Sequence, residues 1–225
     1  GDFIPPAPPR VFSDQKWSGV LPGRYFLETP LSEVAAWAGV DAADLNDPPR
    51  RNVSPGEEIA VVTPDRTLVR MRWGLIPVGR KNARGRPVME TIINARSETV
   101  FDKSAYAGVG RALVPCDGWY EWTGEKRRKT AWRIRSKGGG LMAFAAITDA
   151  WTAPGGRVVD QVATVTCAPN GDVRDIHHRM GVILFQDAFD VWLSGDEAAA
   201  AELMVPLPDG SLVVEEASDV DWDAP

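Results

Sequence analysis

The sequence runs Ile59-Ala-Val-Val-Thr63, Pro64-Asp65-Arg66 and Thr67-Leu-Val-Arg-Met-Arg72 without interruption. Both outer runs are rich in apolar and β-branched residues and follow the two-residue period of a strand, whereas the middle tripeptide has the composition of a tight turn. Two such runs joined by so short a turn predict an antiparallel hairpin. This hairpin makes β-sheet the first expectation for the chain.

Further strand-like runs follow, most of them separated by Gly, Pro or charged turns. They lie at residues 112–114, 119–123, 130–135, 141–147, 162–166, 182–185 and 212–214. Helical patterns are fewer. Thr29-Pro30 up to Gly39 predicts a capped helix with proline at its first position, and residues 187–193 and 196–204 predict two more near the end.

These elements predict a single α+β domain, built on a mostly antiparallel sheet or open barrel with a few peripheral helices. Strands do not alternate with helices, so a doubly wound fold is not expected. The domain is expected over residues 21–225, because no shift in composition divides it into two cores. Residues 1–20 contain four prolines and predict an extended, proline-rich N-terminal arm.

Composition narrows the class of protein. The chain has 225 residues, of which 44% are hydrophobic and only two are cysteine, which suits one ordinary core and argues against a disulfide scaffold. No apolar run approaches the roughly 18 residues that a membrane span needs. We therefore expect a cytoplasmic protein that acts as a monomer and has no membrane partner.

The net charge of −6 hides a strong asymmetry along the chain. Residues 66–137 contain 17 lysines and arginines but only 6 aspartates and glutamates. Folded onto one groove, such a segment can neutralise phosphates although the protein as a whole is acidic. The pattern favours a nucleic-acid partner, and the alternative is an arginine-rich sequence with solvated strand faces.

The segment Pro115-Cys-Asp-Gly-Trp-Tyr-Glu-Trp122 places three aromatic residues around one carboxylate. In a strand, alternation puts Trp119 and Glu121 on one face and Tyr120 and Trp122 on the other. Aromatic neighbours desolvate an acid, raise its pKa and keep it protonated near neutral pH. Glu121 is therefore a candidate proton donor or shuttle, and the alternative is an exposed strand glutamate between core aromatics.

Both histidines of the chain stand side by side in Asp175-Ile-His-His-Arg-Met180. Adjacent histidines cannot both ligate from one helix face, and the two cysteines lack a Cys-x-x-Cys spacing, so no metal site is expected. No nucleotide-binding loop is present either, and we expect no cofactor. A histidine positioned by a polar neighbour can act as a general acid or base, which makes His177 a candidate. The alternative is a loop histidine bonded to the backbone.

A third polar segment, Ile92-Ile-Asn-Ala-Arg-Ser-Glu-Thr99, follows a basic loop at residues 79–86. Asn94 and Arg96 share a face if the segment is a strand. Asparagine offers a donor and an acceptor, and arginine can clamp a phosphate with two bonds, so the pair suits an anionic ligand. Trp73, just before the basic loop, offers an aromatic face on which an exposed base can stack.

Six segments stand in a characteristic order: Gly23-Arg-Tyr25, Asn52-Val-Ser-Pro55, Trp73-Gly-Leu-Ile-Pro77, Ile93-Asn-Ala-Arg96, Pro115–Trp122 and Ile176-His-His-Arg-Met180. Together they resemble the SOS response-associated peptidase (SRAP) family, over about residues 21–215. The resemblance implies a DNA-damage-response protein that binds single-stranded or junction DNA and recognises abasic sites. In that family an N-terminal cysteine attacks the ring-opened sugar, and its thiol and amine close a thiazolidine, a stable DNA–protein crosslink. It also implies a peptidase-like activity that removes a short leader.

The resemblance further implies roles for individual residues. Asn94 would help to hold the reacting N-terminus, while Glu121 and His177 would manage proton transfers and opening of the sugar. The residues that bind DNA would be Arg24, Asn52, Trp73, Arg96 and Arg179.

One position departs from the family pattern. Where the family has Met-Cys-Gly-Arg, this sequence has Leu21-Pro22-Gly23-Arg24. Proline has no thiol, and within a chain its nitrogen is no free amine, so thiazolidine closure is not expected at Pro22. Cys116 and Cys167 are not next to an amine, and Cys116 is expected to fill the core.

Three alternatives follow from this departure. The protein is a noncovalent, single-strand-binding pseudoenzyme, or a hydrolase (peptidase) that uses Glu121 and His177 on a substrate other than DNA, or its natural form begins near Gly23. The family acts as an abasic-site lyase and autopeptidase. We expect this protein to be a member of that type whose covalent chemistry is impaired.

Overall fold

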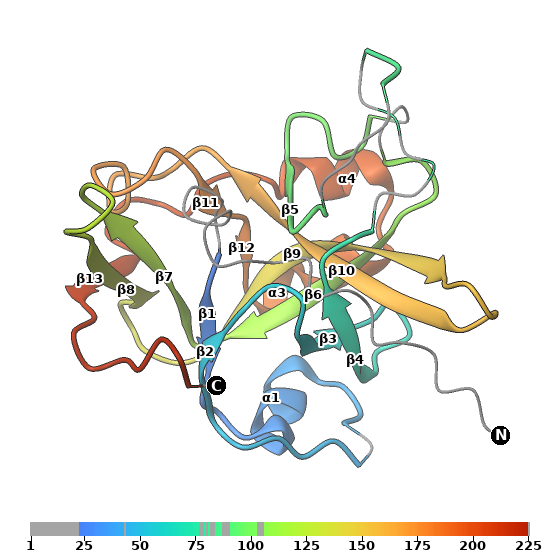
Figure 1. Cartoon of the computed structure of the whole chain (residues 1–225). Coiled ribbons are helices and arrows are strands. Elements are labelled where there is room, and N and C mark those ends of the chain that lie inside the picture. The colour runs from blue at the N-terminus through green and yellow to red at the C-terminus, as the bar shows by residue number, and fades with distance from the viewer. Residues whose placement is uncertain are drawn as a thin grey trace, which may run out of the picture.

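The computed structural model describes residues 23–42, 44–76, 79, 81, 84–86, 91–102 and 106–224. The expected arm at residues 1–20, Pro22 and part of the basic loop lie outside the described residues. The regular elements of the described part are mostly strands, with three helices beside them, which confirms the α+β class (Figure 1).

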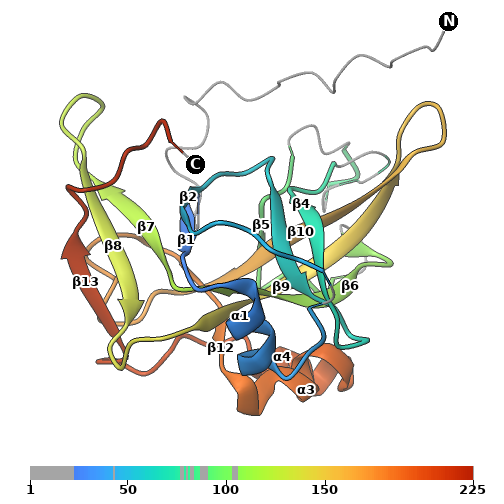
Figure 2. The ribbon, with the colours of Figure 1, turned by 90° about the horizontal axis from the view of Figure 1, so that it is seen from below.

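Five strands form a barrel. They are β3 (Glu58–Val62), β4 (Leu68–Trp73), β6 (Gly110–Cys116), β9 (Met142–Thr152) and β10 (Val158–Cys167). β3 pairs with β4 and β6, β9 pairs with β6 and β10, and β10 pairs with β4, so the pairings form a ring (Figure 2). The sequence predicted a mostly antiparallel sheet or open barrel, and the structure has a barrel that the contact between β10 and β4 closes.

The hairpin expected at residues 59–72 is confirmed. β3 and β4 pair antiparallel from Glu58 opposite Arg72 to Val62 opposite Leu68. In the turn, Arg66 takes a φ of 62°, a left-handed conformation that costs an L-residue about 1 kcal/mol. The two strand-like runs and the short turn between them are therefore enough to specify this pairing.

β10 organises one end of the barrel. It pairs in parallel with β4 and with β5 (Asn94–Arg96), and antiparallel with β9 and β11 (Met180–Gly181). β12 (Ile183–Leu184) continues from β11 and pairs with β9. The parallel pairs join segments far apart in sequence, which a hairpin pattern does not reveal.

A second sheet lies beside the barrel in the strand order β13-β8-β7-β1-β2. Its strands are β1 (Tyr25–Leu27), β2 (Arg50–Val53), β7 (Gly118–Thr123), β8 (Thr130–Ser136) and β13 (Leu212–Glu216). All of its pairings are antiparallel. One face joins the main core through Tyr25 and Trp119, and the other face carries Phe26, Tyr120 and Trp122. The alternation predicted for β7 is therefore confirmed.

The helices are α1 (Leu31–Ala38), α3 (Gln186–Ser194) and α4 (Glu197–Glu202). α1 and α3 meet where the rings of Trp37 and Phe189 lie 5.3 Å apart. The indole N–H of Trp192 donates to the Ala112 carbonyl at 2.8 Å, which fixes α3 on β6. None of the helices in the described part of the chain is long and apolar enough to cross a membrane.

The start of α1 differs from the expectation. Pro30 is the N-cap and Leu31 the first helical residue, and no side chain caps the helix. The hydroxyl of Thr29 donates instead to Asp117 at 2.7 Å, because the loop after β6 comes close at this point. The helix ends as expected at Gly39, whose φ of 66° suits a residue without Cβ.

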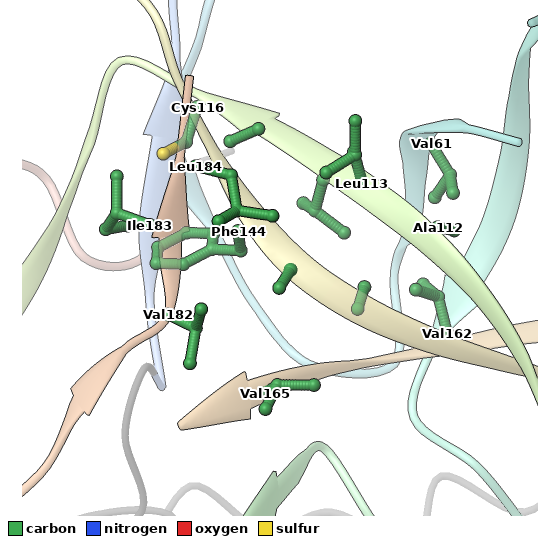
Figure 3. Packing of buried hydrophobic residues seen from close by; sticks show 14 of the residues in the cluster. Val61, Ala112, Leu113, Cys116, Phe144, Val162, Val165, Val182, Ile183 and Leu184 are labelled. Carbon is green, nitrogen blue, oxygen red and sulfur yellow. The ribbon is translucent and has the colours of Figure 1, made fainter. Parts of the chain in front are cut away.

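Buried apolar side chains from several strands of the barrel pack together in the main core (Figure 3). Leu113, Phe144, Val162 and Val165 are all fully buried. Cys116 belongs to the same cluster, as expected, and burial raises the pKa of its thiol well above the usual range. Cys116 is thus an unreactive core residue rather than a substitute nucleophile.

Candidate functional site

Asn94 is held at the edge of the barrel by the parallel pairing of β5 with β10. The register sets Asn94 opposite Thr164 and Arg96 opposite Thr166. The hydroxyl of Thr164 donates to Oδ1 of Asn94 at 2.5 Å. This bond orients the side-chain amide of Asn94. Its oxygen faces Thr164, and its nitrogen, which can donate hydrogen bonds, is directed away from Thr164.

A pair of arginines shares one carboxylate beside Asn94. Nη1 and Nη2 of Arg179 donate to the two oxygens of Glu98 at 2.7 and 2.8 Å, and Nη2 also donates to the Thr166 carbonyl at 2.9 Å. Nε of Arg96 lies 3.7 Å from the same carboxylate. The hydrogen bonds from Arg179 lower the pKa of Glu98 to about 2, so this carboxylate stays ionised.

The two arginines therefore differ in what they offer to a ligand. The side chain of Arg179 is only 11% exposed, whereas that of Arg96 is 66% exposed. Arg96 is the accessible cation of the pair, and Arg179 ties β5 to the loop before β11. Sequence reasoning missed Glu98, although its position two residues after Arg96 on a predicted strand places it on the same face.

His177 is half-buried in the loop between β10 and β11, and its ring stacks on that of His178 with 4.2 Å between centroids. Nδ1 accepts a hydrogen bond from the backbone N–H of Arg179 at 3.0 Å. Burial, and then the neighbouring His178, lower the pKa of His177 to about 4. The ring is neutral at pH 7, and its proton resides on Nε2 because Nδ1 is an acceptor.

Glu121 is the buried acid that the alternation predicted. It is 2% exposed on β7, and the Trp119 side chain donates a hydrogen bond to it. Among the described residues, its Oε1 has no hydrogen-bond partner. Desolvation raises the pKa of Glu121 well above its usual range, which favours the protonated form of the carboxyl.

Arg24 and Asn52 lie on the second sheet and contact each other. Nη1 of Arg24 donates to Oδ1 of Asn52 at 3.0 Å. Nδ2 of Asn52 donates to the carbonyls of Trp222 and Ala224 at 2.9 and 3.1 Å, and the residue is 4% exposed. Both polar ends of this amide are used within the protein.

Trp73 was expected to stack on bases, and that expectation is wrong. The residue is completely buried, its indole N–H donates to the Ile93 carbonyl at 3.1 Å, and its ring packs 5.3 Å from that of Tyr25. Stacking on a base requires an exposed ring face. Trp73 is a core residue because it is the last residue of a barrel strand, where alternation points it inward.

The structure thus gathers four of the expected residues around the end of β10: Asn94, Arg96, His177 and Arg179. Of the other four described candidates, Glu121, Arg24 and Asn52 lie on or beside strands of the second sheet, and Trp73 lies in the core. Pro22 lies outside the described residues. No group of three or more His, Cys, Asp or Glu side chains within the described ranges is arranged to hold a metal ion.

Comparison with known proteins identifies the family. A model of the SOS response associated peptidase (SRAP) family matches residues 21–220. The chain is 34% identical over 186 residues to the abasic site processing protein YoaM of Bacillus subtilis, covering 76% of this chain and 78% of that protein. It is 33% identical over 181 residues to YoqW of Bacillus phage SPbeta, with 76% and 80% covered. A crystal structure of a protein from Bacteroides thetaiotaomicron shares the fold, with a TM-score of 0.75 and 22% identity over 87% of this chain and 92% of that one. The chain belongs to the SOS response associated peptidase (SRAP) family.

Proposed function

We propose that this protein binds single-stranded or junction DNA at abasic sites and acts in the response to DNA damage. Relatives that match three-quarters of the chain are named abasic site processing proteins. At the end of β10, an exposed Arg96 stands beside an oriented amide and a neutral imidazole. As part of the same proposal, the protein is a cytoplasmic monomer, where its two cysteines remain thiols.

The observation that carries the proposal is the buried carboxyl of Glu121, whose Oε1 has no hydrogen-bond partner among the described residues and whose pKa is raised by desolvation, in a protein that also presents a neutral histidine. An abasic sugar is a cyclic hemiacetal, and opening it requires a proton on the ring oxygen and loss of the proton from the anomeric hydroxyl. Glu121 gives its proton to the ring oxygen as the C1′–O4′ bond breaks, and its other oxygen takes the hydroxyl proton as the aldehyde forms. The Nε2–H of His177 donates to the developing aldehyde oxygen, and no net charge is created.

Phosphate contacts position the lesion. Arg96 is the first of them, because it is exposed and lies on the face of Asn94. Arg24 and Arg179, held by Asn52 and Glu98, are further proposed contacts. Asn94 is proposed to hold the segment that precedes β1.

Fluorescence anisotropy with a uracil-excised oligonucleotide tests DNA binding. Arg96→Gln should weaken binding and reduce the slope of log affinity against log salt by about one. Arg157→Gln, at an exposed position between β9 and β10, is the matched control and should change neither quantity. Salt-independent binding, or equal effects of the two variants, would contradict the proposed phosphate contact.

The covalent step of the family needs a thiol beside an amine, and Pro22 offers neither. We expect no stable adduct when the protein is incubated with the same oligonucleotide and analysed by denaturing electrophoresis. A shifted band would show that another amine or thiol of the chain attacks the aldehyde. Strand cleavage that Glu121→Gln abolishes favours sugar opening by the acid, whereas binding without any cleavage leaves the noncovalent pseudoenzyme.

A further inference from the structure

The residues after β13 cross the outer face of the second sheet instead of leaving the protein (Figures 1 and 2). We call residues 217–224 the C-terminal strap. The backbone N–H of Ala217 donates to the Ala131 carbonyl on β8 at 2.8 Å. At the other end, the side chain of Asn52 on β2 holds the carbonyls of Trp222 and Ala224. The strap therefore spans the sheet from β8 to β2.

The indole of Trp222 in the strap packs against two aromatic side chains of this face, Tyr120 and Trp122, which we call the aromatic bed. The ring of Trp222 is 4.8 Å from that of Tyr120 and 5.0 Å from that of Trp122, and both contacts are edge-to-face. Tyr120, Phe26 and Ala217 form a buried cluster separate from the main core. A flat ring is thus the natural occupant of this site.

A guanidinium lies beside the aromatic bed. The guanidinium of Arg133 is 5.9 Å from the centre of the Tyr120 ring, and it pairs with Asp219 of the strap at 2.7 Å. The strap carries two further carboxylates, Asp221 and Asp223, at every second position. Carboxylates spaced along a backbone with a flat ring among them resemble a single strand, which likewise carries negative charges along its backbone and flat rings beside them.

We propose that the outer face of the second sheet is a binding surface for single-stranded DNA, and that the strap occupies it in place of DNA. Bases would lie on Tyr120 and Trp122, and a phosphate on Arg133. The exposed basic turn Lys126–Lys129 at the end of β7 continues the positive charge, and the bond between Asn52 and Arg24 joins the strap to a residue proposed for phosphate binding. The inference rests on the proposed function, because it takes its ligand from there.

Neutralising the strap in the full chain tests the competition. The variant D219N/D221N/D223N should bind an oligo(dT) without any lesion about five- to tenfold more tightly than the wild type, and with a steeper salt dependence. The control D160N/D187N/E197Q removes the same charge at exposed positions away from the second sheet and should give a smaller gain. Adding Arg133→Gln to the strap variant should remove its advantage.

A measurement on the wild type makes the test independent of the variants' folding. Saturating oligo(dT) should raise the amide hydrogen exchange of residues 218–224, because DNA displaces the strap. Equal gains in the two triple variants, or bound DNA with unchanged exchange in the strap, would overturn this inference and leave the proposed function standing. Failure of every variant and of the wild type to bind single-stranded DNA would overturn both.

Discussion

The buried carboxyl of Glu121 should make the stability of the protein fall as the pH rises. Its ordinary pKa is 4.5, and burial in the folded state raises the pKa well above that value. Between these two pKa values the folded state holds a proton that the unfolded state has lost. The free energy of unfolding therefore falls by about 1.4 kcal/mol for each pH unit in this window. The contribution is complete below the unfolded pKa and is lost on the way up to the folded one.

Glu121→Gln keeps the shape of the side chain and removes this titration. The cost of placing an amide beside Trp119 does not change with pH, so it shifts the variant's stability curve by a constant. Relative to the wild type, the variant should gain unfolding free energy as the pH rises above 5, by about 1.4 kcal/mol for each pH unit until the folded pKa is reached. Sugar opening should be lost at the same time, because the amide has no acidic proton to give.

Urea unfolding followed by circular dichroism at pH 5, 6 and 7 measures the difference. Glu216→Gln is the matched control, since Glu216 is exposed on β13 of the same sheet, and it should parallel the wild type. If the curves of wild type and Glu121→Gln also run parallel, the carboxyl is ionised in the folded protein, and the reasoning about a proton donor fails.

Three more outcomes are expected. His177 has a folded pKa of about 4, below its unfolded 6.5, so in pH-dependent urea unfolding the wild type should lose stability relative to His177→Gln as the pH falls through that range; parallel stability curves would contradict the lowered pKa. Trp73→Phe should cost about 2–4 kcal/mol in thermal unfolding without weakening DNA binding by the folded protein, since it leaves a cavity in the core and removes the buried hydrogen bond from the indole to the Ile93 carbonyl; weaker binding at unchanged stability would contradict the core assignment. Gly118→Ala should cost about 3 kcal/mol, because a Cβ there would lie 2.3 Å from a β8 carbonyl oxygen; an unchanged melting temperature would show that the strands move apart freely.

Local pattern was sufficient for much of the fold. The β3–β4 hairpin, the end of α1 at Gly39 and the alternation along β7 each depend on residues close in sequence. The buried acid at Glu121 follows from the same alternation, because its aromatic neighbours are adjacent in the chain. These predictions succeeded because turn geometry and strand periodicity act over a few residues.

Other features depend on pairings between distant segments. The Trp73 position sits in a segment that the resemblance associates with DNA, and only closure of the barrel shows that its ring lies inside. Arg179 was visible as a cation, but its capture by Glu98 requires β5 to lie beside β10. The same holds for the cover over Tyr120, because the strap comes from the far end of the chain.

The sequence alone determined the family's motifs, the strand-rich class and an acid set among aromatic rings, since each is written in neighbouring residues. Tertiary structure alone decided which arginine stays accessible, which tryptophan is core and what covers the second sheet. The physical reason is that burial and charge pairing depend on neighbours in space, and here those neighbours are brought together by a parallel strand pair and a returning chain end.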